Sequence, residues 1–334
     1  MKAVILAGGE GTRLRPLTRR RAKVMVPVLN RPLLSYTLER LAHLGIDEVI
    51  LTLAYRPDDI IAYFGDGYSL GLRLTYVVED TPLGSGGAVK NVAAILDDTF
   101  LVLNGDIFTD LDLRAMISYH RRSGALITIA LAQVDDPSTY GVVEMEPDGR
   151  LLRFLEKPPP EETPSRLVNA GTWIFETEAL EFLPQSPSMV EYDLFPRLLR
   201  EGWPLYGFCS DAYWMDVGTP QRYLQLHHAL LKAGPPRMEP GAWVDPSAAI
   251  EGAVLLGPDC KVGSGARVVG PSCLGESCIV EPGAVVEGSV LWEGVQVGSG
   301  ARLRECVVAS RCRIEAGVEL AGAVLEEENV VAGA

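Results

Sequence analysis

The residues best suited to chemistry lie near the start of the chain, between an apolar run and a basic one. The apolar run Ala3–Leu6 is typical of a short buried strand. Glycines leave no side chains where backbone N–H groups could close on an anion. Arg13 and Lys23 place positive charge nearby. The pattern predicts a phosphate-binding loop at a strand end, built on Gly8, Gly9 and Gly11.

Two better-known glycine motifs do not fit this loop. A dinucleotide fingerprint needs a third glycine where Leu14 stands, and a P-loop needs Gly-Lys followed by Ser or Thr. A tight turn without a ligand is the remaining alternative. Charge argues against it, because the chain has net charge −14 while its first 23 residues hold seven basic residues against the single acid Glu10. This local excess of positive charge predicts an anionic ligand.

The stretch from Leu6 to Thr18, followed by Lys23, resembles the signature of the sugar-1-phosphate nucleotidyltransferases. In that family the glycine-rich loop, its arginine and a downstream lysine hold a nucleoside triphosphate. One departure is that the lysine usually lies between prolines, whereas Ala22 and Val24 flank it here. The resemblance implies nucleotide contacts from Leu6, Ala7, Gly8, Gly9, Gly11, Thr12, Arg13 and Lys23.

A second loop, residues 79–88, is similar to the base-recognition loop of the same family. Read alone, it is a loop and a helix start. The resemblance implies that Glu79, Pro82 and Gly84 bind the nucleotide, with Gly84 letting the backbone approach the base. A carboxylate only accepts hydrogen bonds, so Glu79 or Asp80 suits guanine, which offers adjacent N1–H and N2–H donors. We therefore expect GTP, and either carboxylate could face the base.

The resemblance further implies a metal site and a sugar-phosphate site. Asp106 and Asp216 resemble the metal carboxylates of the family, although an aspartate after a glycine at a strand end can also be a turn former or a helix cap. Mg²⁺ suits such a site because it keeps waters and takes further oxygens from substrate phosphates. The residues expected at the sugar phosphate are Gly141, Glu156, Lys157, Asn169 and Gly171.

The implied reaction is nucleotidyl transfer, in which the phosphate oxygen of a sugar 1-phosphate attacks the α-phosphorus of a nucleoside triphosphate and pyrophosphate leaves. The nucleophile is already anionic, so no general base is needed. Charge on the phosphates must then be neutralised. The expected catalytic residues are Arg13, Lys23, Asp106 and Asp216.

The mix of motifs looks most like the family members that join GTP to mannose 1-phosphate. Members that join dTTP, UTP or ATP to glucose 1-phosphate remain alternatives, as does a heptose-phosphate guanylyltransferase. A catalytically inactive regulatory homologue is a further alternative. A hexapeptide acyltransferase would need a histidine in the C-terminal repeats, and the last histidine in the chain is His228.

The elements that must position the N-terminal motifs follow from hydrophobic periodicity. Strand patterns at 49–53, 74–78 and 100–103 alternate with helical patterns at 33–44 and 88–96. Further strands are expected at 126–131 and 141–145, and Thr219 and Pro220 are expected to open a helix through Tyr223 to Leu231, with Thr219 as its cap. The alternation predicts an α/β fold with a Rossmann-like mixed sheet, which binds ligands at the carboxyl ends of its strands.

A Gly- and Pro-rich linker from Ala233 to Pro240 precedes a different pattern. Nearly all residues four places after the aliphatic ones from Val244 to Val286 are small, so the cysteines there are expected to fill the core. The period predicts a left-handed parallel β-helix of hexapeptide repeats and two domains, residues 1–234 and 235–334. Aliphatic residues recur every six positions, with one-residue slips before Leu291 and Val308: Val244, Ile250, Leu256, Val262, Val268, Leu274, Val280, Val286, Leu291, Val297, Leu303, Val308, Ile314 and Leu320.

Composition excludes several classes of partner. A sequence pI near 4.8 argues against binding nucleic acid or an anionic membrane surface. No apolar run approaches the roughly 20 residues of a membrane span, and no leader pattern is present. We therefore expect a cytoplasmic protein, with nucleoside triphosphate and sugar 1-phosphate as its partners. The β-helix is expected to support a homo-oligomer.

Overall fold

The structure, a computed structural model, describes residues 1–163, 165–231 and 234–333. Its contacts divide the chain into two compact units. The first unit contains residues 1–9 and 34–215, and the second contains residues 10–33 and 216–334. The glycine-rich stretch is therefore divided after Gly9. Ala233, the first residue of the predicted linker, lies outside the described residues.

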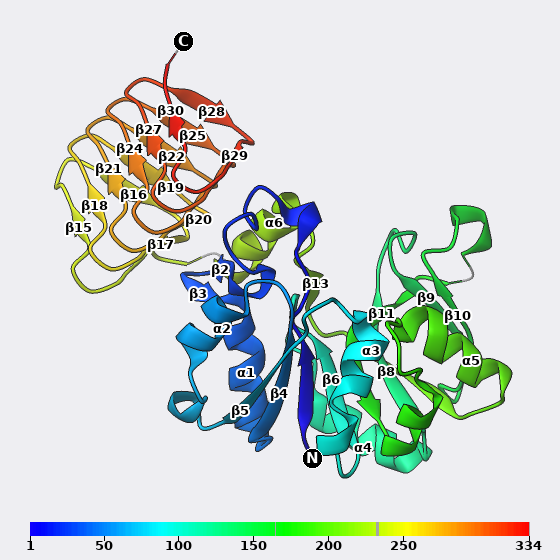
Figure 1. The fold of residues 1–334 in the computed structure, drawn as a ribbon. Coiled ribbons are helices and arrows are strands. Elements are labelled where there is room, and N and C mark those ends of the chain that lie inside the picture. Colours follow the sequence, from blue (N-terminus) through cyan, green and yellow to red (C-terminus); the bar gives the residue numbers. More distant parts are fainter. Residues whose placement is uncertain (164, 232–233, 334) are drawn as a thin grey trace. The chain divides into compact units, whose positions relative to one another are not determined.

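The first unit is built on a mixed sheet, for which the described residues supply nine strands. The path runs β10-β9-β11-β6-β1-β4-β5, and β12 pairs with β8, which pairs with β11. Strands β4, β1 and β6 are parallel, whereas β11 is antiparallel to β6. Figure 1 shows β1, β4 and β6 side by side. The bounds are β1 (Ala3–Leu6), β4 (Glu48–Leu53), β5 (Arg73–Val78), β6 (Phe100–Asn104), β8 (Ile127–Gln133), β9 (Gly141–Met145), β10 (Leu151–Glu156), β11 (Leu167–Phe175) and β12 (Leu205–Cys209).

Helices and short strands complete the first unit. The predicted helix at 33–44 is confirmed as α1, and the strands predicted near residues 49, 74, 100, 126 and 141 are confirmed to within two residues at each end. The helix predicted at 88–96 begins earlier, at Gly84, and its last turn is the 3₁₀ segment Ala93–Ile95. Two short strands, β7 (Ile107–Thr109) and β13 (Trp214–Asp216), pair with each other. The helices are α1 (Leu33–Leu44), α2 (Pro57–Phe64), α3 (Gly84–Asn91), α4 (Leu113–Ser123) and α5 (Phe195–Arg200).

The core of the first unit lies against the sheet and is rich in aromatic side chains. Trp173 on β11 is fully buried, and its ring meets that of Phe195 edge to face at 5.6 Å between centroids. The strands are near-continuous apolar runs, as expected for strands covered on both faces. This packing fixes the strand ends from which the site residues project.

The second unit contains a β-helix of three parallel sheets, whose stacked strands are visible in Figure 1. This confirms the predicted fold class, and the repeats are consistent with a left-handed β-helix. The first sheet contains β14 (Arg237–Met238), β17 (Val254–Leu256), β20 (Ser272–Leu274), β23 (Val290–Leu291), β26 (Val307–Val308) and β29 (Val324–Leu325). The second contains β15 (Trp243–Val244), β18 (Lys261–Val262), β21 (Ile279–Val280), β24 (Gln296–Val297), β27 (Arg313–Ile314) and β30 (Val330–Val331). The third contains β16 (Ala249–Glu251), β19 (Arg267–Val269), β22 (Val285–Glu287), β25 (Arg302–Arg304) and β28 (Glu319–Ala321).

Coil length explains the slips in the six-residue period. Early coils pair residues 18 positions apart, such as Val254 with Ser272. Later coils pair residues 17 positions apart, such as Cys273 with Val290 and Val307 with Val324. Each later coil therefore lacks one residue of three full hexapeptides, while the strand stacking continues without a break.

Small side chains fill the tight inner positions of the β-helix. Cys260, Cys278, Cys306 and Cys312 are fully buried in its core, as predicted, among the stacked aliphatic residues. Their thiols are free, and Cys278 Sγ lies 3.0 Å from the carbonyl oxygen of Trp292. These cysteines therefore act as small apolar side chains.

Helix α6 (Pro220–Leu231) packs on the β-helix within the second unit. Thr219 caps it, since its Oγ1 accepts a hydrogen bond from the Arg222 N–H at 3.3 Å. Tyr223 is fully buried, and its hydroxyl accepts a hydrogen bond of 2.8 Å from the Trp292 indole. His228 donates from Nε2 to the Gly288 carbonyl oxygen at 2.9 Å. The helix is thus fixed to the coils by buried polar contacts.

His227 joins α6 to the segment 10–33. Its Nε2 accepts a hydrogen bond from the Leu29 N–H at 3.2 Å, so that nitrogen carries no hydrogen. Nδ1 then carries the hydrogen and donates to the Tyr223 carbonyl oxygen at 3.0 Å. Burial lowers the pKa of His227 to about 4.

We predict that Leu291→Ala lowers the free energy of unfolding by about 2–5 kcal/mol, because it opens a cavity in the middle of the coil stack. Leu291 is fully buried and paired with Leu274 and Val308 on its two sides. Leu325→Ala is the matched control, since Leu325 lies half-buried in the last strand of the same sheet and should cost less. Urea unfolding followed by circular dichroism measures both, and equal losses would contradict the argument.

We also predict that the His227 contact weakens in acid. The folded pKa lies below the unfolded value, so its stabilisation is fully present above about pH 6.5 and is lost as the pH falls toward 4. The full difference corresponds to on the order of 3 kcal/mol. Urea midpoints at pH 7.5, 6 and 5 should fall less in His227→Gln than in the wild type. His43→Gln, at an exposed position, should follow the wild type; parallel slopes for wild type and His227→Gln would rule the account out.

Candidate active site

The first half of the glycine-rich stretch lies at the carboxyl end of β1. Leu6 is paired with Thr52 and with Asn104, and the Gly105 N–H donates to the Leu6 carbonyl oxygen at 2.9 Å. Ala7 continues this pairing through its N–H to the Thr52 carbonyl oxygen at 3.0 Å. A Cβ on Gly8 would lie 3.3 Å from Ala54, so the chain passes close to its neighbour there.

Asp106 lies at the end of β6, the strand next to β1, and is half-buried. Gly171 on β11 packs beside this strand end, where a Cβ would meet Asn104 Nδ2 at 2.6 Å and Ile107 Cδ1 at 2.4 Å. Gly171 also has φ +67°, which favours glycine. The first unit therefore gathers Leu6, Asp106 and Gly171 at neighbouring strand ends.

The second half of the stretch belongs to the second unit and surrounds Asp216. The Asp216 carboxylate lies 3.7 Å from an Arg13 nitrogen and 3.8 Å from Lys23 Nζ, and the side chain is 13% exposed. Arg222 in the first turn of α6 places NH1 3.3 Å from the same carboxylate. Together these four side chains carry two net positive charges. The structure thus brings together Arg13, Lys23 and Asp216, and adds Arg222.

Two glycines leave room for this charge cluster. Gly11 has φ +64°, and a Cβ there would lie 3.0 Å from Lys23 Cβ and 3.1 Å from Thr18 Cγ2. A Cβ on Gly218 would lie 3.0 Å from an Asp216 carboxylate oxygen. Thr12, next to Gly11, is exposed. The glycines therefore let Lys23 and Asp216 approach the loop backbone.

Glu79 follows β5 and is half-buried, whereas Asp80 is exposed. Glu79 Oε2 accepts a hydrogen bond from the Leu83 N–H at 2.9 Å. Its Oε1 is buried and meets no hydrogen-bond donor among the described residues. Burial raises the pKa of Glu79, and the Leu83 hydrogen bond lowers it in part. An unpaired buried carboxylate oxygen is costly, and it can accept from a ligand.

The loop after Glu79 is held by the segment near Ser188. Pro82 is exposed, and α3 begins at Gly84, which has φ +75°. A Cβ on Gly84 would lie 2.4 Å from the Ser188 carbonyl oxygen. The absence of a side chain at Gly84 therefore serves close packing of two loops in the first unit.

The residues predicted at the sugar phosphate form two groups. Gly141 on β9 is paired with Glu156 on β10, and a Cβ on Gly141 would lie 2.7 Å from Glu156 Oε2. Lys157 pairs with Glu156 Oε1 at 3.0 Å and has φ +48°, a strained value for lysine. Asn169 on β11 uses its Oδ1 to accept from the Gly171 N–H at 3.0 Å and from the Trp173 indole at 2.8 Å. Its amide nitrogen is the group left to donate.

Sequence reasoning missed Glu191 and Arg222. Glu191 lies in the π-helical segment Val190–Leu194, where its Oε2 accepts from Ser85 Oγ at 2.7 Å. Burial raises the pKa of Glu191, and the charges of Glu156 and Lys157 also act on it. Glu191 resembles any first-turn acid in the sequence, so no pattern marks it. Arg222 could have been found, because Thr219 and Pro220 mark a helix start whose first turn faces Asp216.

The structure describes no resident metal cluster and no membrane helix. Among the described residues, no group of three or more His, Cys, Asp and Glu side chains is arranged to hold a metal ion. A site of one or two carboxylates completed by phosphate oxygens is a different arrangement, and it suits Mg²⁺. No helix in the described part of the chain is long and apolar enough to cross a membrane.

Comparison with known proteins places this geometry in context. Residues 2–233 match the nucleotidyl transferase family, and residues 250–333 match the GMPPB C-terminal domain. A mannose-1-phosphate guanylyltransferase of Mycobacterium tuberculosis is 38% identical over 304 residues, covering 89% of this chain and 81% of that protein. A UTP–glucose-1-phosphate uridylyltransferase of Synechocystis is 35% identical over 361 residues, covering 98% and 92%.

Solved structures show the same fold in the catalytic part. HddC from Yersinia pseudotuberculosis, complexed with GMP-PN, is 30% identical with a TM-score of 0.58, covering 67% of this chain and 97% of that chain. A putative glucose-1-phosphate thymidylyltransferase from Bacillus anthracis is 24% identical with a TM-score of 0.62, covering 68% and 93%. The second likeness concerns the fold alone.

Proposed function

The chain belongs to the nucleotidyl transferase family, and on this premise we propose that it transfers GMP from GTP to mannose 1-phosphate, giving GDP-mannose and pyrophosphate. The observation that carries the choice of base is the buried, unpaired Oε1 of Glu79. Guanine presents two adjacent N–H donors, which a carboxylate accepts well. Uracil and thymine flank their single N–H with carbonyl oxygens, which a carboxylate repels. The similarity to mannose-1-phosphate guanylyltransferases supports the same choice.

We propose that the triphosphate binds along the glycine-rich stretch, with Arg13 and Lys23 neutralising its charge. A phosphate oxygen of mannose 1-phosphate forms a bond to the α-phosphorus, and the bond from that phosphorus to the bridging oxygen breaks. Pyrophosphate leaves with the electron pair, and no proton transfer is required. Asp216 keeps Arg13 and Lys23 together, and the net charge of the cluster favours a phosphate.

The sugar phosphate is proposed to bind near Glu156 and Lys157 in the first unit. Lys157 would pair with its phosphate, while Glu156 would accept from sugar hydroxyls. The Asn169 amide nitrogen would donate to a hydroxyl, since its oxygen is already used by Trp173. The lack of a side chain at Gly141 lets Glu156 pack against the backbone, and the lack of one at Gly171 does the same for Ile107.

Members of the family generally use a divalent metal ion, and we propose Mg²⁺ held by Asp106 and Asp216. The donor set fits, because Mg²⁺ needs few protein carboxylates when phosphate oxygens complete its shell. When bound, the ion would neutralise charge on the phosphates. The choice of Asp106 and Asp216 rests on the sequence signature.

The remaining expectations stay predictions. These are a domain boundary between residues 234 and 235, a homo-oligomer formed through the β-helix, a cytoplasmic location, and partners restricted to the two substrates. The family matches leave residues 234–249 between them. The division of the chain into two compact units instead groups residues 10–33 with residues 216–334.

We predict that pyrophosphate is released with Mg²⁺ only when GTP and mannose 1-phosphate are supplied together. The test pairs GTP, dTTP, UTP and ATP with mannose 1-phosphate and glucose 1-phosphate. Turnover with UTP and glucose 1-phosphate would favour the activity of the Synechocystis relative and overturn the choice of guanine. No release in any of these pairings would overturn the proposed reaction and favour an inactive regulatory homologue.

We further predict that Glu79→Gln raises the KM for GTP about tenfold or more, because the amide presents a donor beside a guanine N–H. The ratio of kcat/KM for GTP over UTP should fall, while the KM for mannose 1-phosphate should change less than threefold. Asp80→Asn is the discriminating variant. If Asp80→Asn relaxes the base preference and Glu79→Gln does not, the exposed carboxylate reads the base.

A further inference from the structure

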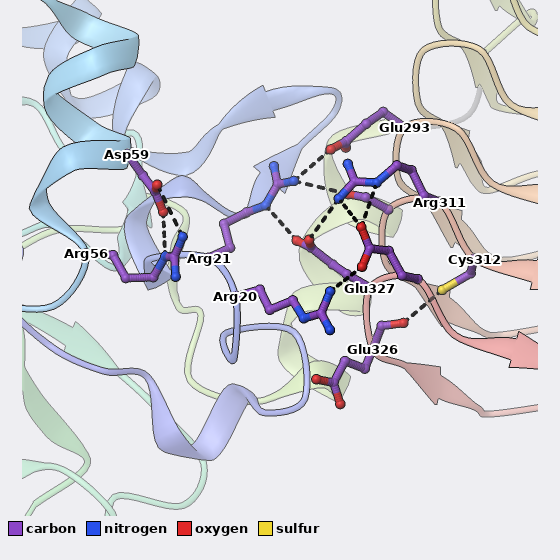
Figure 2. A network of polar contacts seen from close by, with 11 residues as sticks. Arg20, Arg21, Arg56, Asp59, Glu293, Arg311, Cys312, Glu326 and Glu327 are labelled. Atoms are coloured by element: carbon purple, nitrogen blue, oxygen red, sulfur yellow. Dashed lines mark hydrogen bonds and ion pairs between the residues drawn. The ribbon is translucent and has the colours of Figure 1, made fainter.

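Three consecutive arginines before Lys23 meet three consecutive glutamates in the last coil of the β-helix. Arg19 pairs with Glu326 at 2.5 Å, Arg21 with Glu327 at 3.2 Å, and Arg20 with Glu328. Figure 2 shows Arg20 and Arg21 directed toward these carboxylates. All six residues belong to the second unit. Part of the positive charge that the sequence suggested for a ligand is therefore matched within the chain.

The three ion pairs differ in solvent exposure, and this exposure determines how strongly each pair holds the segment to the β-helix. Arg19 and Arg20 are 57% and 52% exposed, and ion pairs that are open to solvent contribute little to stability. Arg21 is 24% exposed, and its partner Glu327 is 9% exposed. The pair of Arg21 with Glu327 is therefore the least exposed of the three ion pairs.

Arg21 contacts several side chains of the β-helix besides Glu327. Its NH2 donates to Glu293 Oε1 at 2.7 Å and to Ser310 Oγ at 3.1 Å. Its guanidinium carbon lies 4.9 Å from the centre of the buried Trp292 ring. Burial lowers the pKa of Arg21, but the charges of Glu293 and Glu327 raise it by more. Burial raises the pKa of Glu293, but the charge of Arg21 and the hydrogen bonds from Ser310 and Arg21 together lower it overall, so both groups stay charged.

Arg21, which is held by the β-helix, lies close to Lys23 along the chain. Only Ala22 separates Arg21 from Lys23, so two peptide units of at most about 7 Å connect them. Ala22 is buried, and its carbonyl oxygen accepts from the Met25 N–H at 2.9 Å. Beyond Lys23, Asn30 donates to the Leu274 carbonyl oxygen of the β-helix at 3.0 Å. Along the chain, Lys23 therefore lies between Arg21 and Asn30, which both contact the β-helix.

We propose that Arg21 is a positioning residue, through which the β-helix holds Lys23 in place for the triphosphate. This inference rests on the proposed function, because it assigns Lys23 to the phosphates. Arg21 acts through Lys23 and does not itself contact the substrate. A displacement of the lysine by about 1 Å is enough to cost up to about 100-fold in rate.

The test is a double-mutant cycle of Arg21→Gln and Lys23→Met. If Arg21 acts through Lys23, Arg21→Gln should lower kcat/KM for GTP by about 10- to 100-fold in the wild type and by less than threefold in Lys23→Met. The KM for mannose 1-phosphate should change less than threefold in Arg21→Gln. Equal factors in both backgrounds would overturn the proposal, because a general loss of structure acts regardless of Lys23.

Two further variants keep the test decisive. Glu327→Gln leaves Arg21 and its Glu293 contact in place, so it replaces Arg21→Gln in the cycle if that variant fails to fold. Arg267→Gln is the matched control, since Arg267 makes an exposed pair with Glu251 at 3.1 Å on an earlier coil. It should leave kcat/KM unchanged, and a loss as large as that of Arg21→Gln would overturn the proposal.

The cycle uses the nucleotide and sugar phosphate that the wild type turns over. A wild type that uses UTP and glucose 1-phosphate overturns the proposed specificity, while the cycle still tests Arg21. A wild type that turns over no pairing overturns the proposed reaction and this inference with it. Unchanged kinetics in folded Arg21→Gln and Glu327→Gln overturn the inference alone.

Discussion

The proposed phosphate site must hold like charges close together before a phosphate arrives, and the Asp216 carboxylate would meet this constraint. Two unit positive charges about 5 Å apart repel by about 3 kcal/mol at an effective dielectric constant near 20. Asp216 offsets that repulsion by facing Arg13, Lys23 and Arg222 at 3.3–3.8 Å. Arg222 NH1 donates a hydrogen bond to Asp216 Oδ2 at 3.3 Å, whereas the Arg13 and Lys23 nitrogens lie at ion-pair distances of 3.7 and 3.8 Å. Gly11 and Gly218 contribute to the same arrangement, because a side chain at Gly11 would press on Lys23 and one at Gly218 on the carboxylate.

The β-helix supports the segment that carries these charges. Residues 10–33 follow β1 in sequence, yet they group with the coils and α6. His227, Asn30 and Arg21 each tie the segment to that scaffold through a hydrogen bond or an ion pair. A coil stack has little freedom to deform, since each strand between the first and last coils is paired on both sides. The scaffold therefore holds this arginine-rich segment in a fixed place.

The fold could be predicted well from the sequence because two hydrophobic patterns are strong, one in each unit. The apolar runs of β1, β4 and β6 and the six-residue repeat each have a physical cause in a buried face. The predicted start of α3 was four residues too late, because Gly84 and Gly86 disfavour a helix. Only the packing of these glycines against Ser188 explains why they are present.

The site was less predictable than the fold. The grouping of Arg13, Lys23 and Asp216 agrees with the signature, whereas Glu191 carries no signal in the sequence. The pairing of Arg21 with Glu327 spans 306 residues, and neither charge run shows its partner when read alone. The unpaired oxygen of Glu79 also required coordinates, because burial of a single atom has no pattern in sequence.

The arrangement of the last coil places a limit on its length as well as on its composition. Glu327 is sheltered, while Glu326 and Glu328 on either side are more exposed. Inserting or deleting one residue after Leu325 would bring a neighbouring carboxylate, or none, into the place beside Arg21. Substitutions on the outer face of this coil leave that register intact. Over evolution, the coil should therefore accept changes of residue more readily than changes in the number of residues.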